Sequence, residues 1–365
     1  MSLKKDNFTS LDKKYMQIAI NLAKNHKGYT GSNPSVGCVI VKNNSIISFG
    51  NTSFNGRPHA EIIALKRSKK NIKGSDVYLT LEPCTHYGKT PPCTNALIKS
   101  KVKKVIYSSF DTDLRTKNRA KKILKYKNIK TRSDLLKNQT TNFYKNYNYT
   151  KKTQLPYLTG KIACSSNYKI FKNKNFITNK HSRKVTHVLR SQNQGILTSY
   201  KTLNNDDPIL NCRIQGLEKF SPIKLIIDKD LKLKKKLNIF KNKKIKNYIF
   251  HSSNNKKKIK KLKDNGLKLI KINIDKDKYL NLKDIFKEIY KIGISNVLIE
   301  CGPNLTNKLL NLNIINEFYL FKSEKKIKAS NSINIIKTQK ILSNKFKFKK
   351  IINTFLDKNR LIHYY

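Results

Sequence analysis

The sequence predicts an α/β protein made of two successive domains. Its 365 residues are enough for about two domains of 100–200 residues each. Apolar, strand-like runs alternate with helix-like stretches twice along the chain, which is typical of a largely parallel sheet with helices on both faces. Between the two series, residues 138–153 show little periodicity. We therefore expect domains at 1–147 and 148–365.

The first domain is predicted to begin with an amphipathic helix over 11–26, stopped by Gly28 and Gly31. One side of that helix is apolar at helical spacing: Tyr15, Ile18, Ala19 and Leu22. A hairpin is expected over 36–51 because Asn43-Asn44, which tolerates positive φ, separates two apolar strands. The following elements are a helix over 58–68, a strand over 76–84, a helix over 92–100 with Pro92 near its first turn, and a strand over 103–110.

The second domain repeats this alternation. Strands are expected over 157–165, 195–199, 223–228, 246–253, 267–273 and 296–302. Helices are expected near 179–193, 256–264 and 283–291. The last twenty residues, 346–365, are predicted to close the domain as a β-hairpin, and the Lys-rich stretches 232–246 and 256–263 to be solvated loops and helix faces.

The formal net charge of +56 comes from 78 Lys and Arg against 22 Asp and Glu. Such an excess ordinarily indicates a nucleic-acid or anionic partner. Here the lysines lie along the whole chain beside Asn and Ile, as in 241–250, and a compositional bias produces the same profile. We therefore expect weak, unspecific nucleic-acid binding and leave a polyanion partner open as the alternative.

The sequence contains no apolar run of about 18 residues, so we expect no membrane span. The N-terminal residues lack the apolar core of a signal peptide. Six cysteines, at 38, 84, 93, 164, 212 and 301, are too sparse for a disulfide framework. We expect a cytoplasmic protein with cysteines available for metal, and we leave a homo-oligomer open.

Three residues have the chemistry of a zinc site: His59, Cys84 and Cys93. Zinc binds Cys thiolate and His, and a catalytic site keeps one position for water. Pro83 fixes the turn that carries Cys84, and the start of a helix favours a thiolate at Cys93. Glu61 follows His59 by two residues, so it can reach the water without binding the metal. This is the His-x-Glu and Pro-Cys pattern of zinc deaminases, with nine positions rather than three between the cysteines.

The segments 33–41, 57–61 and 80–98 closely resemble the deaminase of riboflavin biosynthesis, and the whole chain resembles the bifunctional bacterial family. The resemblance implies a cytidine-deaminase-like domain followed by a dihydrofolate-reductase-like domain. The implied substrate is 2,5-diamino-6-(5-phosphoribosylamino)pyrimidin-4(3H)-one, whose 2-amino group is removed with Glu61 as proton carrier. By the same resemblance, Asn33 contacts the pyrimidine and Lys89 lies beside the substrate. Thr52 stands where the family usually has a His.

The second half resembles the reductase of the same family at 187–213 and 298–305. The implied reaction is hydride transfer from NADPH to ribose C1′, which opens the ring to ribityl. The resemblance implies these contacts with NADPH: Ala163, Phe176, Thr202, Asp206 and the turn from Gly302. It implies these contacts with the substrate: Arg190, Leu210, Arg213 and Glu300. A guanidinium suits phosphate because it offers a bidentate fork, and Arg is rare in this Lys-rich chain.

Several positions of the second half depart from the family pattern. Asn167 and Tyr168 stand where the family has Asp-Gly, and Phe176 where it has Trp. The charged stretch 322–330 replaces an apolar segment. A Gly allows close backbone approach or positive φ, so we expect slow reduction. Two alternatives remain open at this point: a working deaminase with an inactive, structural second domain, and a deaminase of tRNA bases.

Overall fold

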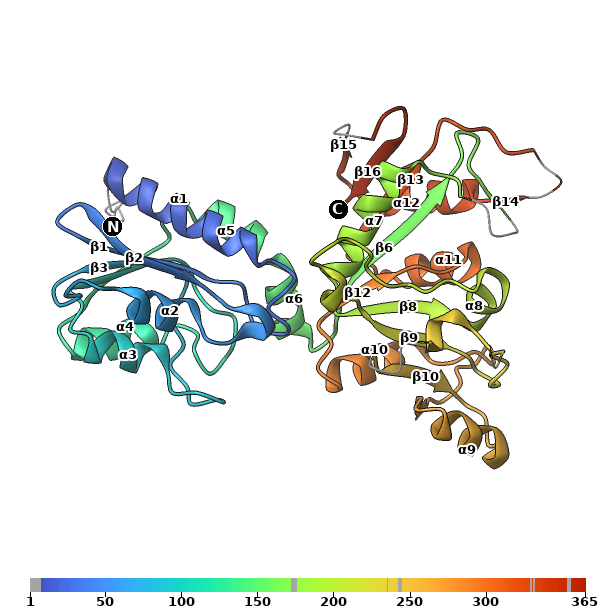
Figure 1. Cartoon of the computed structure of the whole chain (residues 1–365), viewed down its shortest axis with the longest axis horizontal. Helices are drawn as coiled ribbons and strands as arrows, with labels where there is room; N and C mark the ends of the chain where they lie inside the picture. The colour runs from blue at the N-terminus through green and yellow to red at the C-terminus, as the bar shows by residue number, and fades with distance from the viewer. Residues whose placement is uncertain are drawn as a thin grey trace. The chain divides into compact units, whose positions relative to one another are not determined.

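The computed structural model describes residues 8–171, 176–234, 236–241, 245–328, 330, 332–352 and 356–365. The chain divides into two compact units, Met1–Gln154 and Leu155–Tyr365, each with its own sheet and hydrophobic core (Figure 1). The domain boundary expected between 147 and 148 falls inside helix α6 (Lys145–Thr153), which belongs to the first unit.

The first unit is a mixed sheet covered by helices. Its strands are β1 (Gly37–Lys42), β2 (Ser45–Asn51), β3 (Asp76–Leu81), β4 (Lys104–Ser109) and β5 (Lys130–Ser133). Its helices are α1 (Ser10–Asn25), α2 (Ala60–Arg67), α3 (Cys93–Lys99), α4 (Ala120–Tyr126), α5 (Lys137–Phe143) and α6, with a 3₁₀ turn, η1, over Phe54–Gly56. The strand order is β2-β1-β3-β4-β5. Strand β1 is antiparallel to both neighbours, whereas β3, β4 and β5 are parallel.

Local chemistry explains the ends of the first elements. Thr9 caps α1, because its hydroxyl accepts from the Asp12 N–H while the Asp12 carboxylate accepts from the Thr9 N–H. Gly28, at φ 89°, follows the end of the helix. Asn43 and Asn44 turn the β1–β2 hairpin at φ 49° and 57°, as the sequence predicts.

Both faces of the first sheet are buried. Helix α1 packs on one face, where its apolar side meets residues of β1, β3 and β4: Tyr15, Met16, Ala19 and Ile20 against Val39, Val41, Tyr78 and Ile106. Helices α2, α3 and α4 pack on the other face (Figure 1). The expected helices on both faces are confirmed.

The weakly periodic stretch 138–153 folds as helices α5 and α6, which the sequence did not predict. Buried tyrosine and threonine side chains hold α5 in place. The Tyr144 hydroxyl lies 2.6 Å from Thr80 Oγ1 and donates to the Ser35 carbonyl at 3.0 Å. Such contacts are polar and span up to 109 positions of the chain, so apolar periodicity does not reveal them.

The second unit is a larger α/β sheet. Its strands are β6 (Tyr157–Cys164), β7 (Lys169–Phe171), β8 (Gly195–Ser199), β9 (Ile223–Ile227), β10 (Asn247–His251), β11 (Lys268–Lys271), β12 (Asn296–Ile299), β13 (Glu317–Lys322), β14 (Ser332–Asn334), β15 (Lys349–Ile352) and β16 (Arg360–Tyr364). Its helices are α7 (Lys180–Ser191), α8 (Tyr200–Asp206), α9 (Lys256–Asp264), α10 (Leu282–Lys291), α11 (Pro303–Asn311) and α12 (Ile336–Lys345). Two 3₁₀ turns complete it, η2 (Glu218–Phe220) and η3 (Asn238–Phe240).

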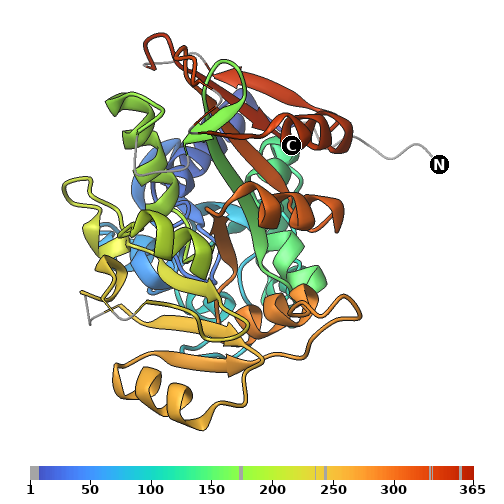
Figure 2. The same cartoon turned by 90° about the vertical axis from the view of Figure 1, so that its right-hand side faces the viewer.

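The main sheet of this unit has the order β11-β10-β9-β8-β12-β6-β13-β16-β15. From β11 through β13 in the sheet order just given, neighbouring strands are parallel. Strand β16 is antiparallel to both β13 and β15. The closing hairpin predicted for 346–365 is therefore present as β15 and β16. Helices α7, α8 and α9 cover one face, and α10 and α11 the other; Figure 2 shows the sheet between the two groups.

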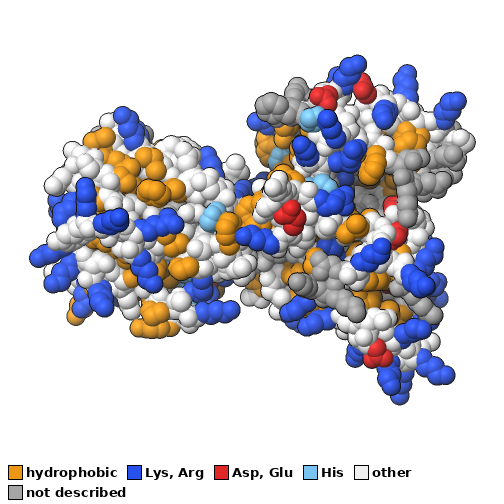
Figure 3. Space-filling model, viewed as in Figure 1, with side chains coloured by type: hydrophobic (Ala, Val, Ile, Leu, Met, Phe, Trp, Pro, Cys, Tyr) orange, Lys and Arg blue, Asp and Glu red, His pale blue; other side chains and the backbone are white. Residues whose placement is uncertain are grey.

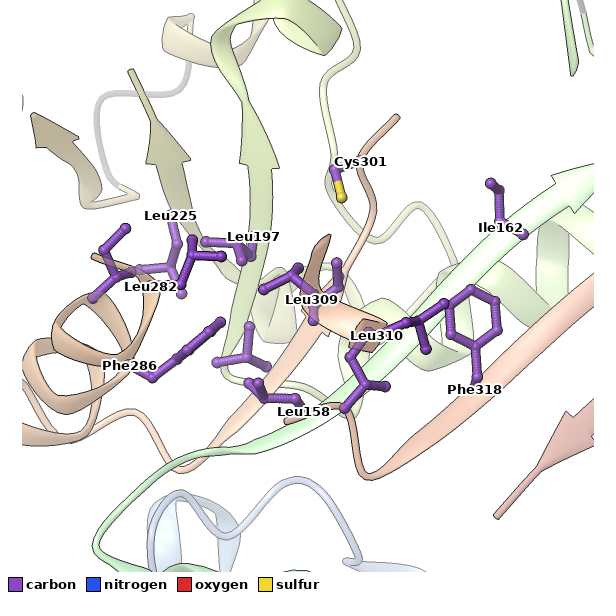
Figure 4. Close-up of a cluster of buried hydrophobic side chains, with 14 of the residues drawn as sticks. Leu158, Ile162, Leu197, Leu225, Leu282, Phe286, Cys301, Leu309, Leu310 and Phe318 are labelled. Carbon is purple, nitrogen blue, oxygen red and sulfur yellow. The ribbon is translucent and has the colours of Figure 1, made fainter. Parts of the chain in front are cut away.

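The largest core lies between this sheet and helices α10 and α11. In Figure 4, Leu282 and Phe286 of α10 and Leu309 and Leu310 of α11 point toward Leu158, Leu197 and Leu225 of the strands. These side chains are almost fully buried, and full burial of one Leu or Phe is worth about 1.5–3 kcal/mol. The core fixes the strand ends that carry the second candidate site.

The positive charge is dispersed. Figure 3 shows Lys and Arg side chains over the visible face of each unit, between apolar and uncharged groups. Of the Lys-rich stretch 232–246, residues 235 and 242–244 lie outside the described part of the chain. Among the described helices, none is both long and apolar enough to cross a membrane.

Candidate functional site

The first unit brings His59, Cys84 and Cys93 to one point. His59 is the N-cap of α2, Cys84 follows β3 through Pro83, and Cys93 is the first residue of α3. The His59 Nδ1 atom lies 3.6 Å from Cys84 Sγ and 3.3 Å from Cys93 Sγ. All three ligand atoms lie within 4.8 Å of one another. The cluster predicted from the sequence is therefore assembled in the fold.

This geometry fits zinc. Tetrahedral coordination with Zn–S near 2.3 Å and Zn–N near 2.0–2.1 Å places sulfur and nitrogen ligands about 3.5 Å apart. The two N–S distances, 3.6 and 3.3 Å, lie on either side of that value. Three protein ligands leave a fourth position for water or substrate, as in catalytic zinc sites.

Hydrogen bonds pre-form the cysteine pair. The Cys93 N–H at the start of α3 donates to Cys84 Sγ at 3.2 Å, and the Cys93 thiol also interacts with that sulfur. Interaction with the Cys93 side chain, with further help from His59, lowers the pKa of Cys84 to about 4. The same interaction with Cys84, together with burial, raises the pKa of Cys93. Cys84 is therefore held ready as a thiolate ligand.

Glu61 lies beside the cluster rather than in it. It is in the first turn of α2 and only 3% exposed. Burial raises the pKa of its carboxyl, while His59 acts in the opposite direction. A carboxyl whose pKa is moved toward neutrality suits proton transfer. The structure thus agrees with the spacing argument that separated the two roles of His59 and Glu61.

Glu82 is a buried carboxylate that sequence reasoning missed. It directly precedes the Pro83-Cys84 turn and is 3% exposed. Its Oε2 accepts from the Asp111 and Asn118 N–H groups at 3.2 and 3.1 Å, and its Oε1 from the Ala120 N–H at 3.1 Å. Glu82 therefore ties the loop before α4 to the turn that carries Cys84. The signal for it was a carboxylate at the end of an apolar strand.

The insert between the cysteines is anchored to the same loop. Thr85 Oγ1 donates to the Arg115 carbonyl at 2.9 Å, and His86 Nδ1 lies 3.1 Å from Thr116 Oγ1. Lys89 lies exposed near the tip of the insert. His86, which sequence reasoning also missed, is a second imidazole between the two cysteine ligands.

Asn33 and Thr52 are fixed by the loop before α2. The Asn33 Nδ2 donates to the Gly56 carbonyl at 3.0 Å. Gly56 has φ 86°, and a Cβ there would come within 2.6 Å of Asn33 Nδ2, so this position requires glycine. Thr52 is buried, and its Oγ1 accepts from the Val36 N–H at 2.9 Å. Thr52 therefore serves the fold at the position where the resembled family has His.

In the second unit, several predicted residues lie at one edge of the sheet. Ala163, Thr202 and Glu300 stand at or just after the carboxyl ends of β6, β8 and β12, which are neighbours in the order β8-β12-β6. In open α/β sheets this edge is where ligands bind.

A buried ion cluster joins Arg190 to Glu300. Arg190 Nε and Nη2 donate to the two carboxylate oxygens at 2.7 and 3.0 Å, and Lys161 Nζ lies 3.7 Å from Glu300 Oε2. Burial acts to raise the pKa of Glu300, but Arg190 and Lys161 outweigh it and hold the pKa at about 2. Lys161, missed from the sequence, was detectable as a single charge inside the strand 157–165.

Asn211 connects the arginines. Its carbonyl accepts from Arg190 Nη1 at 3.2 Å and lies 3.0 Å from His187 Nδ1, while its Oδ1 accepts from Arg213 Nη1 at 3.2 Å. Arg213 is exposed. Leu210 is 4% exposed, has φ 53° and packs in the core beneath the site.

The remaining predicted residues are less closely grouped. Phe176 is 70% exposed, with the Arg183 guanidinium 4.4 Å from its ring centre. Asp206 is the exposed last residue of α8.

The turn at Gly302 fits a phosphate group. Gly302 is the N-cap of α11, and no side chain among the described residues caps this helix. A Cβ at Gly302 would meet no atom of the described residues within 4 Å, so the space beside this backbone turn is open. Unpaired N–H groups at a helix N-terminus bind phosphate. This turn therefore fits the phosphate of a cofactor.

Family comparisons divide the chain in the same way. Residues 9–109 match the cytidine and deoxycytidylate deaminase zinc-binding region. Residues 160–351 match the RibD C-terminal domain.

Relatives similar along most of the chain carry the description "Riboflavin biosynthesis protein RibD". The protein of Aquifex aeolicus is 32% identical over 319 residues, covering 86% of this chain and 87% of its own. That of Buchnera aphidicola subsp. Baizongia pistaciae is 33% identical over 357 residues, covering 92% and 94%.

Solved structures agree. Acinetobacter baumannii RibD superposes with a TM-score of 0.84 at 26% identity, covering 97% of this chain and 98% of that one. The diaminohydroxyphosphoribosylaminopyrimidine deaminase/5-amino-6-(5-phosphoribosylamino)uracil reductase of Thermotoga maritima gives 0.78 at 25% identity, with the same coverage. These matches favour neither a tRNA base deaminase nor a chain with an inactive second domain.

Proposed function

The chain belongs to the RibD family of riboflavin biosynthesis proteins, and from this membership we propose how its own residues carry out the two reactions. It is a bifunctional enzyme with a zinc-binding deaminase half and a reductase half. The first reaction removes the 2-amino group of 2,5-diamino-6-(5-phosphoribosylamino)pyrimidin-4(3H)-one by hydrolysis. The second reduces the ribosyl group of the product to ribityl.

For deamination we assign the metal to His59, Cys84 and Cys93 and the proton transfer to Glu61. When bound, zinc makes a water molecule more acidic and more nucleophilic at neutral pH. Glu61 would carry one proton of the attacking water to the ring nitrogen and then the remaining hydroxyl proton to the amino group, which leaves as ammonia while the carbonyl forms. The single observation that carries this assignment is the 3% exposed Glu61 beside three ligand atoms within 4.8 Å of one another.

Substrate placement in the first unit is assigned to Asn33 and Lys89. Asn33 offers a fixed amide to the polar edge of the pyrimidine, since Gly56 holds its side chain. Lys89 lies exposed on the insert, where its ammonium can pair with the substrate phosphate.

For reduction we assign the substrate to Arg190, Arg213, Leu210 and Glu300. Arg213 is exposed, and its guanidinium offers N–H groups beyond the one bonded to Asn211 that can pair with phosphate. Arg190 donates three N–H groups to Glu300 and the Asn211 carbonyl, so its main proposed role is to orient the Glu300 carboxylate. Leu210 supports this loop from the core. Glu300, held ionised by Arg190 and Lys161, faces the reacting ribose as an acceptor.

NADPH is assigned to the carboxyl edge of the second sheet. Its proposed contacts are Ala163, Phe176, Thr202, Asp206 and the turn from Gly302. Bound NADPH supplies a hydride to ribose C1′, and the uncapped N-terminus of α11 binds a phosphate of the dinucleotide. We further propose that the enzyme works in the cytoplasm, acts on a phosphorylated small molecule without specific nucleic-acid partners, and functions as a homo-oligomer. We propose residues 1–147 as the deaminase domain and residues 148–365 as the reductase domain, with helix α6 at their boundary.

The test is to incubate the pure protein with the diaminopyrimidinone phosphate, with and without NADPH, and to identify the products by mass spectrometry. Ammonia release without NADPH and a ribityl product with it are expected. Cys84→Ser should lose zinc and deamination, whereas Glu61→Gln should keep about one zinc per chain and lose deamination. The control is Cys212→Ser, which changes a buried free cysteine of the second unit and should keep both zinc and deamination. A Glu61→Gln protein that deaminates normally would show that the assignment is wrong.

A further inference from the structure

Two segments that depart from the family pattern contact each other in the second unit. The turn at Ser165–Lys169 follows β6, and the segment Ser323–Ile327 follows β13. Strands β6 and β13 are parallel neighbours, so both segments leave the sheet at its carboxyl edge. That edge also carries Ala163 and Glu300. We call these two segments the 165/327 clamp.

The Asn167 side chain is the centre of the clamp. Its Nδ2 donates to the Ile327 carbonyl at 3.0 Å, and its Oδ1 accepts from the Ile327 N–H at 3.2 Å. The Ser165 hydroxyl also donates to Oδ1 at 2.6 Å. One side chain therefore pairs with both backbone groups of Ile327, as an adjacent strand would.

Further bonds run in parallel with this pair. The Ser166 N–H donates to the Lys325 carbonyl at 2.9 Å, and the Ser323 N–H donates to the Cys164 carbonyl at 2.8 Å. The Ser165 hydroxyl accepts from the Lys169 N–H at 2.9 Å and so closes the turn. The clamp is thus a continuous network rather than one contact.

Tyr168 completes the network although it stands where the resembled family has Gly. It adopts φ 55°, so the position does require the left-handed region. Its ring lies 4.0 Å from Lys322 Nζ and packs against the main core, and its carbonyl accepts from the Ile335 N–H at 2.9 Å. The packing and the cation–π contact offset the strain of that backbone conformation.

We propose that Asn167 is a positioning residue for NADPH, which acts by holding the segment after β13 against the end of β6 beside Ala163. This inference rests on the proposed function, which assigns the cofactor to that edge. The sequence treats Asn167 and the charged stretch after β13 as separate departures from the family pattern, whereas Asn167 and Ile327 are bonded to each other.

The chemistry of the pair requires an amide at this position. An aspartate at 167 can accept from the Ile327 N–H and the Ser165 hydroxyl. Its second oxygen would face the Ile327 carbonyl, now 3.0 Å from the amide nitrogen, so two acceptors would oppose each other and the carbonyl would lose its donor. Restoring the family's Asp alone should therefore weaken the clamp in this chain.

The experiment compares Asn167→Asp with the wild-type full chain. We would measure the Kd for NADPH by fluorescence titration, kcat and KM for reduction, the thermal midpoint, and ammonia release as an internal control. Loss of one hydrogen bond with a buried unpaired group corresponds to about a tenfold rise in Kd and KM for NADPH. At saturating NADPH, kcat should stay within about twofold, and ammonia release should not change.

A second variant and a control keep the test decisive if Asn167→Asp folds poorly. Ser165→Ala removes one donor to Asn167 and should raise Kd by about threefold. Gln339→Ala removes an exposed side-chain hydrogen bond to Ser343 within α12, outside the clamp, and should bind NADPH as the wild type does.

The possible outcomes separate the two claims. A raised Kd with unchanged kcat in both Asn167→Asp and Ser165→Ala supports the positioning role. A lowered thermal midpoint with an unchanged Kd assigns the clamp to stability alone and overturns the inference. Wild-type protein that binds no NADPH overturns the proposed function and this inference with it.

Discussion

Replacing Glu82 by glutamine should loosen the loop that precedes α4. The two oxygens of Glu82 accept three backbone N–H groups, those of Asp111, Asn118 and Ala120. Glutamine keeps the shape of the side chain but turns one oxygen into an NH₂ group. If its oxygen faces Asp111 and Asn118, its NH₂ group faces the Ala120 N–H, and donor opposes donor.

The size of the effect follows from the lost bond. A hydrogen bond to a charged group contributes about 1.5–3 kcal/mol, and Glu82 is 3% exposed, so water cannot replace it well. Taking about 2 kcal/mol, local opening of the loop becomes about 30-fold more frequent, at 1.4 kcal/mol per tenfold. Burial raises the pKa of Glu82, and the three backbone N–H groups act against that rise by favouring the carboxylate form.

Hydrogen–deuterium exchange of peptides covering 110–121 measures this opening directly. We expect about 30-fold faster exchange at the Ala120 amide in Glu82→Gln, and faster zinc loss, because the loop also anchors Thr85 and His86. Glu324→Gln is the control, because the Glu324 side chain is half exposed and its Oε2 lies 3.9 Å from Lys358 Nζ, which is a long distance for an ion pair. Unchanged exchange at 110–121 in Glu82→Gln would refute the reasoning.

Three further predictions concern stability and charge. Arg190 and Lys161 lower the pKa of Glu300 from 4.5 to about 2, so this carboxylate stabilises the second unit above about pH 4.5 and loses that contribution as the pH falls toward 2. Over this range the thermal midpoint should fall, and the free energy of unfolding should decrease by up to about 3 kcal/mol; an equal decrease in Glu300→Gln would contradict the assignment. Gly37→Ala should destabilise the first unit by about 3 kcal/mol, because the new Cβ would lie 1.9 Å from the Ala19 carbonyl oxygen; calorimetry measures it, and wild-type stability would argue against this packing. RNA binding should be weak and fade between about 50 and 200 mM salt, as filter binding can show; tight, structure-selective tRNA binding at physiological salt is the contrary result.

The metal cluster could be predicted from the sequence because its residues lie in short motifs. His59 with Glu61, and Cys84 after Pro83, each carry a local signal of residue type and spacing. Strand and helix positions were equally readable wherever apolar periodicity was strong, as in α1 and β6. What such motifs leave out is the partner of a side chain far away in the chain.

Several features that the sequence did not reveal depend on such distant partners. Glu82 binds amides up to 38 positions later, and Arg190 reaches Glu300 across 110 positions. In the sequence, Asn167 is seen only as a departure from the family's Asp. The structure shows that its side chain is bonded to Ile327, 160 positions away. Helices α5 and α6 depend on polar contacts such as Tyr144 with Ser35, which leave no hydrophobic pattern.

The placement of β6 between β12 and β13 affects how the chain can fold during synthesis. Every element of the first sheet precedes Gln154, so the cluster of His59, Cys84 and Cys93 can assemble while later residues are still being made. Strand β6 instead pairs with β12 and β13, and its Thr159 bonds to Glu317, 158 positions later. On the ribosome, β6 must wait unpaired for most of the second unit to emerge. Such long-range parallel pairing is slow and exposes apolar edges, so we expect the reductase half to be the part of the nascent chain that needs chaperone protection.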